Sequence, residues 1–187
     1  MIDHLRKLLF IHISRTGGTS VETALVGSDW WHIDPESKHL SASQTRRFYG
    51  DAYWAKYRKF SIVRNPWDRV ASMWSTGWWN KKRTGFLGRG PASFRDFIRE
   101  LRPHPHERYR TLWYNKILDE PLDYVLRFES LQEDFSAMCR ELRLAEVQLP
   151  HVEGRSRLPY RAYYDDESAR LVRDLFAADI KAYGYQF

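Results

Sequence analysis

Short hydrophobic runs alternate with amphipathic segments along the chain. Three runs, residues 8–13, 60–64 and 124–128, have the length and the aliphatic and aromatic content of buried strands. Apolar residues recur at helical spacing in residues 19–27, 44–49, 66–79, 93–101, 131–142 and in a last helix that begins at 165–167. Because strands that alternate with helices are joined by right-handed crossovers, we expect an α/β fold with a mainly parallel central sheet flanked by helices.

Local signals mark several of the predicted helix ends. Gly27 is placed to end the first helix, and Pro66 suits the first turn of a later one. Ser41 or Ser43 can cap the helix at residues 44–49. These caps predict where helices begin and end without reference to tertiary contacts.

The composition is that of one compact domain. The 187 residues are 43% hydrophobic and 29% charged, which excludes disorder, collagen-like repeats and coiled coil. We see no internal repeat or linker, so residues 1–187 are predicted to form a single domain. The single cysteine, Cys139, excludes an internal disulfide and a multi-cysteine zinc site, and we place it in the core.

Charge and hydropathy bear on partners and compartment. The formal net charge of +6 favours an anionic partner. The run Leu8–Ile13 is too short for a signal-peptide core or a membrane span, so we expect a cytoplasmic protein with no membrane span. Aromatic residues make up 16% of the chain, and the clustered tryptophans are candidates for a stacking surface, with core packing as the alternative.

The first predicted strand ends in a glycine-containing loop. Residues 14–20 read Ser-Arg-Thr-Gly-Gly-Thr-Ser and lie where ligands bind in an open parallel sheet, beyond the carboxyl end of a strand. Glycines let backbone amides approach an anion, and the start of the next helix adds a favourable dipole. The segment predicts a phosphate-binding loop, with an ordinary tight turn as the alternative.

The second predicted strand ends in Arg64, and Ser72 follows in the next helix. A buried guanidinium is costly without a partner, so we expect Arg64 to meet a carboxylate or a phosphate. A nucleotide hydrolase would instead have Gly-Lys-Ser/Thr in the first loop and an acidic metal ligand after another strand. Neither feature is present, and this combination suits a doubly phosphorylated nucleotide bound without a metal.

Two motifs resemble those of sulfotransferases that use 3′-phosphoadenosine 5′-phosphosulfate. Residues 13–20 resemble the 5′-phosphosulfate loop of this family, and residues 62–74 resemble its 3′-phosphate motif. The second match is the more specific, because the family spacing is kept at Arg64, Pro66, Arg69 and Ser72. Weaker similarity continues through residues 125–131 and 179–185. The chain most resembles the carbohydrate and bacterial branch that includes heparan sulfate 2-O-sulfotransferase.

The resemblance implies a fold, a reaction and a set of site residues. The fold would be like that of P-loop nucleotide hydrolases, and a sulfuryl group would pass from the donor to an acceptor hydroxyl without a metal, leaving adenosine 3′,5′-bisphosphate. The 5′-phosphosulfate would be held by Arg15, Thr16, Gly17, Gly18, Thr19 and Ser20. Arg64 and Ser72 would hold the 3′-phosphate. In the family a C-terminal basic or aromatic loop closes over the nucleotide, which implies Arg155, Arg157 or Tyr160.

The resemblance also implies two catalytic residues. Arg15 stands where the family usually has lysine; arginine supplies charge and a bidentate fork but is a poor acid, so we expect it to stabilise charge on the bridging oxygen. Lys38-His39-Leu40-Ser41 resembles the segment that carries the catalytic histidine of heparan sulfate 2-O-sulfotransferase, which implies His39 as the base. His32 and Glu36 are the alternatives for the base.

Two other functions compete with this interpretation. One is a kinase-like phosphotransferase, which would require magnesium and ATP. The other is a basic nucleic-acid-binding module, which the scattered basic residues and the lack of a nucleic-acid motif disfavour. The acceptor stays open between a carbohydrate, a phenol and a tyrosyl hydroxyl, and the basic segment Lys81–Arg89 is a candidate guide for an anionic acceptor, with a solvated loop as the alternative. The sequence leaves the oligomeric state undetermined.

Overall fold

The computed structural model describes residues 1–77, 91–101, 112–151 and 157–187. The chain divides into two compact units. The first unit holds Met1–Arg64 and Arg110–Gly154, and the second holds Asn65–Tyr109 and Arg155–Phe187. The expectation of one domain over residues 1–187 stays a prediction.

A four-stranded sheet lies in the first unit, in the order β1-β2-β3-β4. The strands are β1 Ile2–Asp3, β2 Leu8–Ile11, β3 Arg58–Val63 and β4 Tyr124–Arg127. β2 pairs in parallel with β3, where Phe10 lies opposite Phe60, and β3 pairs in parallel with β4. Among the described strands, the short β1 alone pairs antiparallel, with β2. These pairings confirm the expected α/β class with a mainly parallel sheet.

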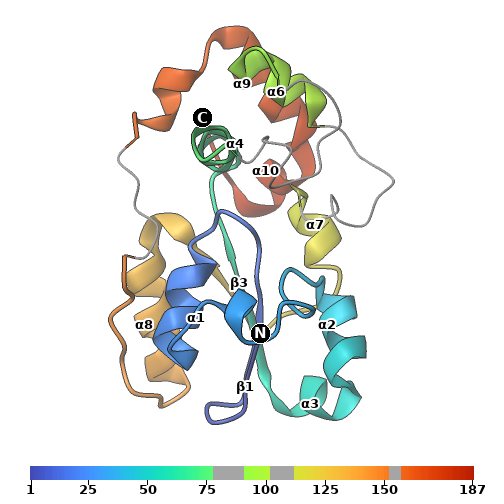
Figure 1. Cartoon of the computed structure of the whole chain (residues 1–187), viewed down its shortest axis with the longest axis vertical. Coiled ribbons are helices and arrows are strands. Elements are labelled where there is room, and N and C mark those ends of the chain that lie inside the picture. The colour runs from blue at the N-terminus through green and yellow to red at the C-terminus, as the bar shows by residue number, and fades with distance from the viewer. Residues whose placement is uncertain (78–90, 102–111, 152–156) are drawn as a thin grey trace. The chain divides into compact units, whose positions relative to one another are not determined.

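Helices cover both faces of this sheet, with α1 and α8 on one side and α2 and α3 on the other (Figure 1). Their bounds, with those of the short helices of this unit, are α1 Gly18–Val26, η1 Trp30–His32, α2 Ala42–Tyr49, α3 Asp51–Lys56, α7 Tyr114–Ile117, η3 Phe128–Ser130 and α8 Leu131–Glu141. The core combines strand residues with the inner faces of α1 and α8, and includes Leu8, Phe10, Val21, Leu25, Phe60, Ile62, Leu126, Phe135 and Met138. Cys139 belongs to this core, as expected.

The predicted caps of two helices in the first unit are confirmed. Ser41 begins α2 in a capping box, in which its Oγ accepts a hydrogen bond from the Gln44 N–H at 3.3 Å. The Gln44 side chain in turn accepts one from the Ser41 N–H at 2.8 Å. Gly27 ends α1 at a φ of +79°, a left-handed conformation that glycine adopts without a Cβ clash. Ser43, the alternative cap, donates its hydroxyl to Asp119 Oδ2 at 2.6 Å instead.

The described part of the second unit is helical. Its helices are α4 Pro66–Ser75, α6 Phe94–Glu100, η4 Tyr160–Tyr163, α9 Asp166–Leu175 and α10 Ala177–Tyr183. Pro66 occupies the first turn of α4 as predicted, and Asn65 caps that end by accepting a hydrogen bond from the Trp67 N–H at 3.0 Å. The predicted last helix is two helices, because Phe176 leaves helical geometry at φ −110° and ψ 23°.

Several short elements of the described residues went unpredicted. β1, α3 and α7 hold two, six and four residues, which is too few for a hydrophobic period to be visible in the sequence. The helix expected over residues 66–79 ends at Ser75, and residues 78 and 79 lie outside the described residues. In the part of the chain that the structure describes, no helix is long and apolar enough to cross a membrane.

Candidate functional site

A left-handed turn joins β2 to α1 through the loop at residues 14–18. Arg15 and Gly17 have φ angles of +65° and +85°. Thr16 is fully buried, and its hydroxyl donates to the Ile13 carbonyl at 2.7 Å, which closes the turn from inside. The loop predicted from the sequence is therefore tightly folded onto the end of the strand.

Both glycines of the loop are required by their surroundings. A Cβ on Gly17 would lie 2.9 Å from Leu131 Cδ2, in addition to the strain of its positive φ. A Cβ on Gly18 would lie 2.6 Å from His12 Nε2, closer than real Cβ atoms approach their neighbours. Only residues without side chains fit here, because Leu131 and His12 already fill the space that a Cβ would take.

The N-terminal end of α1 faces this loop. Gly17 is its N-cap residue, and among the described residues no side chain caps this end by a hydrogen bond. The first turn also contains no acidic residue. The amides of a first helical turn point out of the helix end and attract anions, so Gly18 and Thr19 offer donors to a negatively charged group.

Arg64, at the end of β3, is buried beside the loop with an exposure of 6%. Its Nη1 donates to the carbonyl of Arg15 at 3.0 Å, and its guanidinium carbon lies 3.8 Å above the centroid of the Phe128 ring. The Tyr114 hydroxyl accepts a hydrogen bond from the Arg64 N–H at 3.0 Å and donates one to its carbonyl. The Arg15 carbonyl and the Phe128 ring are two of the contacts that hold the guanidinium, and an anionic partner for it stays a prediction.

His39 lies against the start of the loop. Its Nδ1 is 3.0 Å from the carbonyl oxygen of His12, the residue that follows β2. The two imidazole rings meet edge to face with centroids 4.6 Å apart, and Trp31 packs against His39 at 5.6 Å. Of the three candidate bases, the structure brings His39 to the loop, whereas His32 and Glu36 are exposed.

His39 is neutral at physiological pH. Burial, with smaller contributions from the neighbouring His12 and Lys38, lowers its pKa to about 3, against opposing contributions from its hydrogen bond to the His12 backbone and from Glu22. A neutral imidazole keeps one nitrogen lone pair that can take a proton.

A buried polar network beneath the loop was missed by the sequence analysis. Glu22, on α1, is fully buried, and its Oε1 lies 2.6 Å from His12 Nδ1. Its Oε2 accepts hydrogen bonds from Lys38 Nζ at 2.8 Å and from the Trp30 N–H at 3.2 Å. Lys38 Nζ also contacts Asp29 Oδ1. One signal in the sequence could have indicated it: Glu22 follows Val21, a residue of the helix face that packs on the sheet.

Electrostatics keep Glu22 ionised inside this network. Burial alone would raise the pKa of the carboxyl, but hydrogen bonds from His12 and Lys38 outweigh it and hold the pKa at about 2. Burial also lowers the pKa of His12, which its bond to Glu22 opposes without reversing. The network therefore contains an ionised Glu22 and a neutral His12.

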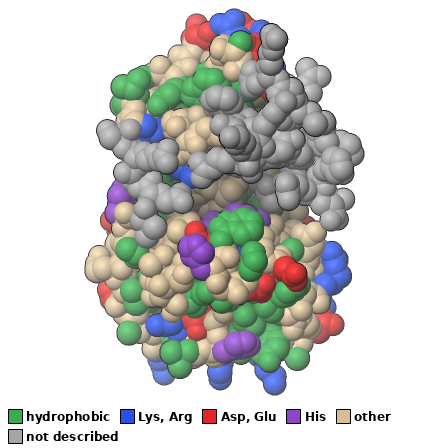
Figure 2. Space-filling model, viewed as in Figure 1, with side chains coloured by type: hydrophobic (Ala, Val, Ile, Leu, Met, Phe, Trp, Pro, Cys, Tyr) green, Lys and Arg blue, Asp and Glu red, His purple; other side chains and the backbone are tan. Residues whose placement is uncertain are grey.

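An exposed aromatic surface adjoins His39. In the space-filling view, histidine side chains gather beside hydrophobic ones over the first unit (Figure 2). Trp31 is 51% exposed and Ile33 48% exposed. For the clustered tryptophans the sequence left stacking and core packing as alternatives. Trp30 is buried in the core, and its indole N–H donates to Ser37 Oγ at 2.6 Å.

The remaining predicted residues lie in the second unit. Ser72 is 3% exposed within α4. Arg157 forms an ion pair with Asp68, in the first turn of α4. Tyr160 begins η4 and packs edge to face on Phe187, with ring centroids 5.9 Å apart. Arg155 and the basic segment Lys81–Arg89 lie outside the described residues.

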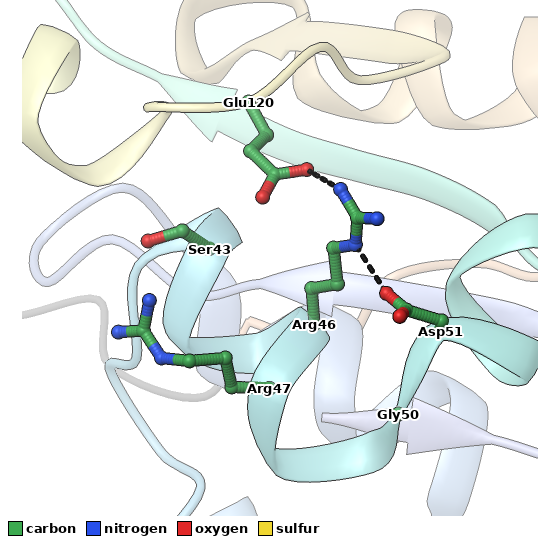
Figure 3. Close-up of a pocket in the computed structure, with 6 residues that line it drawn as sticks. All are labelled: Ser43, Arg46, Arg47, Gly50, Asp51 and Glu120. Atoms are coloured by element: carbon green, nitrogen blue, oxygen red, sulfur yellow. Dashed lines mark hydrogen bonds and ion pairs between the residues drawn. The ribbon is translucent and has the colours of Figure 1, made fainter.

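A polar hollow of about 290 Å³ opens elsewhere on the first unit, beside α2 (Figure 3). It is lined by Ser43, Arg46, Arg47, Gly50, Asp51 and Glu120, none of which is a predicted site residue. Arg46 crosses it to reach Asp51 at 2.5 Å and Glu120 at 3.1 Å. Its two arginines and two carboxylates balance, so the hollow shows no charge preference.

The fold and the loop define the class of protein. The first long strand of the parallel sheet leads through a glycine turn into a helix without a side-chain cap, and a buried arginine ends the neighbouring strand. This arrangement is typical of α/β proteins that hold anionic groups. The chain belongs to the sulfotransferase family, whose model matches residues 1–186. Membership makes the protein a transferase of sulfuryl groups to acceptor hydroxyls in general. A comparison with curated proteins found no match.

The family match confirms the resemblance at the level of the family. The likeness to the branch that includes heparan sulfate 2-O-sulfotransferase stays a prediction, as do the roles of the individual site residues. Among the residues that the structure describes, no group of three or more His, Cys, Asp or Glu side chains is arranged to hold a metal ion.

Proposed function

We propose that the protein transfers a sulfuryl group from 3′-phosphoadenosine 5′-phosphosulfate to an acceptor hydroxyl and releases adenosine 3′,5′-bisphosphate. The observation that carries the proposal is the loop between β2 and α1. Its two glycines leave no room for a Cβ, and its helix end offers uncapped amides next to the buried Arg64. The anionic mixed anhydride of phosphate and sulfate is the type of group that such a loop accepts.

The donor is held by charge and by backbone amides. The amides of Gly17 and Gly18, with the hydroxyls of Thr19 and Ser20 and the backbone of Thr16, bind the 5′-phosphosulfate. Arg15 lies next to them in a left-handed conformation and supplies positive charge to the bridging oxygen. Arg64 and Ser72 bind the 3′-phosphate, the assignment that follows from their spacing in the family motif.

The transfer itself is one in-line displacement. The acceptor oxygen forms a bond to sulfur while the bond between sulfur and the bridging oxygen breaks, and that electron pair remains on the departing phosphate. His39 removes the proton of the acceptor hydroxyl, which avoids an unfavourable positive charge on the attacking oxygen. Arg15 stabilises the negative charge that develops on the bridging oxygen.

The acceptor is placed by aromatic side chains in this proposal. Trp31 is half exposed and contacts His39, so a sugar ring or a phenol stacked on Trp31 lies next to the base. Arg157 and Tyr160, with Arg155 outside the described residues, are the candidates for closing over the nucleotide.

Thermal unfolding of the purified protein with adenosine 3′,5′-bisphosphate tests the donor site. A ligand at about 100 times its dissociation constant adds roughly 2.7 kcal/mol to the free energy of unfolding. We expect the bisphosphate to stabilise the protein without metal, and AMP to stabilise it less because it lacks the 3′-phosphate. The Arg64→Ala variant should lose the difference between the two ligands.

The same experiment decides between the proposal and its competitors. Stabilisation by ATP with magnesium alone would mean a phosphotransferase. Equal stabilisation by AMP and the bisphosphate would refute the 3′-phosphate site. The nucleic-acid module needs a separate binding measurement, in which a steep loss of RNA or DNA affinity with rising salt would favour it.

A further inference from the structure

The hydrogen-bond partners of two histidines determine which nitrogen of each ring carries a proton. His39 Nδ1 faces the carbonyl oxygen of His12, and His12 Nδ1 faces a carboxylate oxygen of Glu22. A carbonyl oxygen and an ionised carboxylate only accept hydrogen bonds, so each Nδ1 must be the donor. In a neutral imidazole the lone pair then lies on Nε2.

Glu22 ties together the two chain segments that meet at His39. One carboxylate oxygen holds His12, which precedes the loop, and the other holds Lys38, the residue before His39. The Trp30 N–H donates to the same second oxygen, which also anchors η1. Lys38 extends the connection to Asp29, whose side chain accepts from the Trp31 N–H at 2.9 Å.

The backbone at His39 needs such an anchor. His39 has a φ of +65°, a region that a residue with a Cβ rarely adopts. Such a conformation persists only where its surroundings hold it, and the Lys38 side chain, 1% exposed, is held on both sides by carboxylates. The imidazole is thereby directed to the His12 carbonyl.

We infer that Glu22 and Lys38 are positioning residues for the reaction, which hold His39 as its Nδ1–H tautomer with the Nε2 lone pair turned to the acceptor. The inference rests on the proposed function for the role of His39 as the base. His12 connects the two, because it bonds to Glu22 through its ring and to His39 through its carbonyl. The His12 ring is 5% exposed and packs against Gly18 at the start of α1.

Donor binding should raise the pKa of His39 toward neutral pH. The charged and titratable groups that act on its ring are His12, Lys38 and Glu22, and the first two disfavour its protonated form. A bound dianion next to the loop favours that form and raises the pKa of His39. A base that gains basicity when the donor arrives is suited to take a proton only in the loaded protein.

Nitrogen-15 NMR of the full-length chain tests the inference, because long-range correlations of the imidazole protons distinguish the two neutral tautomers and the charged form. In the wild-type protein at pH 6.5 we expect His12 and His39 both as single Nδ1–H tautomers. An Nε2–H tautomer or a charged ring at His39 would overturn the inference without any variant.

Variants separate positioning from general stability. Glu22→Gln and Lys38→Met should each turn the His39 signals into a mixture of tautomers, while Lys38→Arg, which keeps a cation between Glu22 and Asp29, should preserve the single form. Asp51→Asn is the matched control, because Asp51 is an ion-paired carboxylate with 81% of its side chain exposed on α3. An unchanged Nδ1–H tautomer in both Glu22→Gln and Lys38→Met would refute the role of the pair.

Titration with adenosine 3′,5′-bisphosphate distinguishes a failure of this inference from a failure of the proposed function. A rise of at least one unit in the pKa of His39 on saturation supports both together. A correct tautomer that responds to Glu22→Gln, in a protein that does not bind the bisphosphate, would refute the proposed donor but not the positioning of His39. Binding of the bisphosphate with an Nε2–H tautomer would refute the inference alone.

Discussion

The ion pairs beneath the loop of the first unit and those between α6 and α9 of the second differ in their exposure. The side chains of Lys38 and Glu22 are 1% and 0% exposed. Those of Arg99 and Glu167, which meet at 2.6 Å, are 48% and 42% exposed. The distances are similar, but the first pair is buried and the second is exposed to water.

This difference changes what each pair contributes. Water and salt screen the exposed pair, which typically contributes about 0.2–1 kcal/mol. The buried pair is expensive to desolvate, and only its complete set of hydrogen bonds offsets that cost. The comparison teaches that the buried pair stabilises one arrangement of the loop, whereas the exposed pair adds little to the specificity of the fold.

The largest expected effect is the loss of one buried partner. Lys38→Met leaves the Glu22 carboxylate buried without its cation, and we expect the free energy of unfolding to fall by about 3–5 kcal/mol. Urea denaturation at pH 7 measures this loss. The double variant Glu22→Gln/Lys38→Met should lose less than the sum of the two single variants, because no uncompensated charge remains. A loss below about 1 kcal/mol in Lys38→Met would make the buried pair equivalent to the exposed one.

A second effect separates the loop glycines from the other glycines. Gly18→Ala places a methyl group on the buried His12 ring, so we expect a loss of about 1–3 kcal/mol. Gly27→Ala is the control: its added Cβ would meet no atom within 4 Å, and only the strain of the positive φ, about 1–2 kcal/mol, applies. Thermal unfolding compares the two. The loss of bisphosphate binding in Gly18→Ala but not in Gly27→Ala would link the packing of His12 to the donor loop.

The pH dependence of stability sharpens the contrast further. The pKa of His39 is about 3 when folded and near 6.5 when unfolded, so the unfolded chain binds the proton first and stability is lost as the pH falls from about 6.5 toward 3. Glu22, with a folded pKa of about 2, adds a loss below about pH 4.3. Urea denaturation at pH 7 and pH 5 measures the first part.

His39→Asn is the control for this titration, because asparagine tolerates a left-handed backbone and does not titrate. We expect a shallower decline between pH 7 and pH 5 in the variant, with a remainder from His12, whose pKa is also lowered. An identical decline in both proteins would show that the His39 imidazole is protonated as easily in the folded state as in the unfolded chain.

The smallest expected effect is at the exposed pair. Arg99→Gln removes one partner of Glu167, and we expect a loss of about 0.2–1 kcal/mol that shrinks in 0.5 M salt. Denaturant unfolding at low and high salt measures it. A loss above about 2 kcal/mol, unaffected by salt, would contradict the distinction between the two regions.

The sequence predicted the elements that depend on neighbouring residues. The strand–loop–helix at the phosphate-type loop, the capping box of Ser41 and the start of α4 at Pro66 are all present, because each is encoded within a few positions. The family resemblance, carried by the motifs at residues 13–20 and 62–74, is confirmed by the family match.

The sequence failed where partners are distant or elements short. It could not predict that the guanidinium of Arg64 rests on Phe128, 64 positions away in the chain, and on the Arg15 carbonyl. It left the clustered tryptophans open between a stacking surface and the core, and the structure buries Trp30 and exposes Trp31. The break at Phe176 between α9 and α10 leaves the apolar period almost intact and was therefore invisible.

By itself, the sequence determined the α/β class, the position of the glycine loop and the family, since backbone preferences, periodicity and motif spacing are local properties of the chain. Only the tertiary structure decided which histidine lies against the loop and what holds it there. Glu22 and Lys38 are 16 positions apart and meet only because α1 and the segment before α2 both pack at the end of β2. The cost of leaving a charge buried without a partner selects that one arrangement.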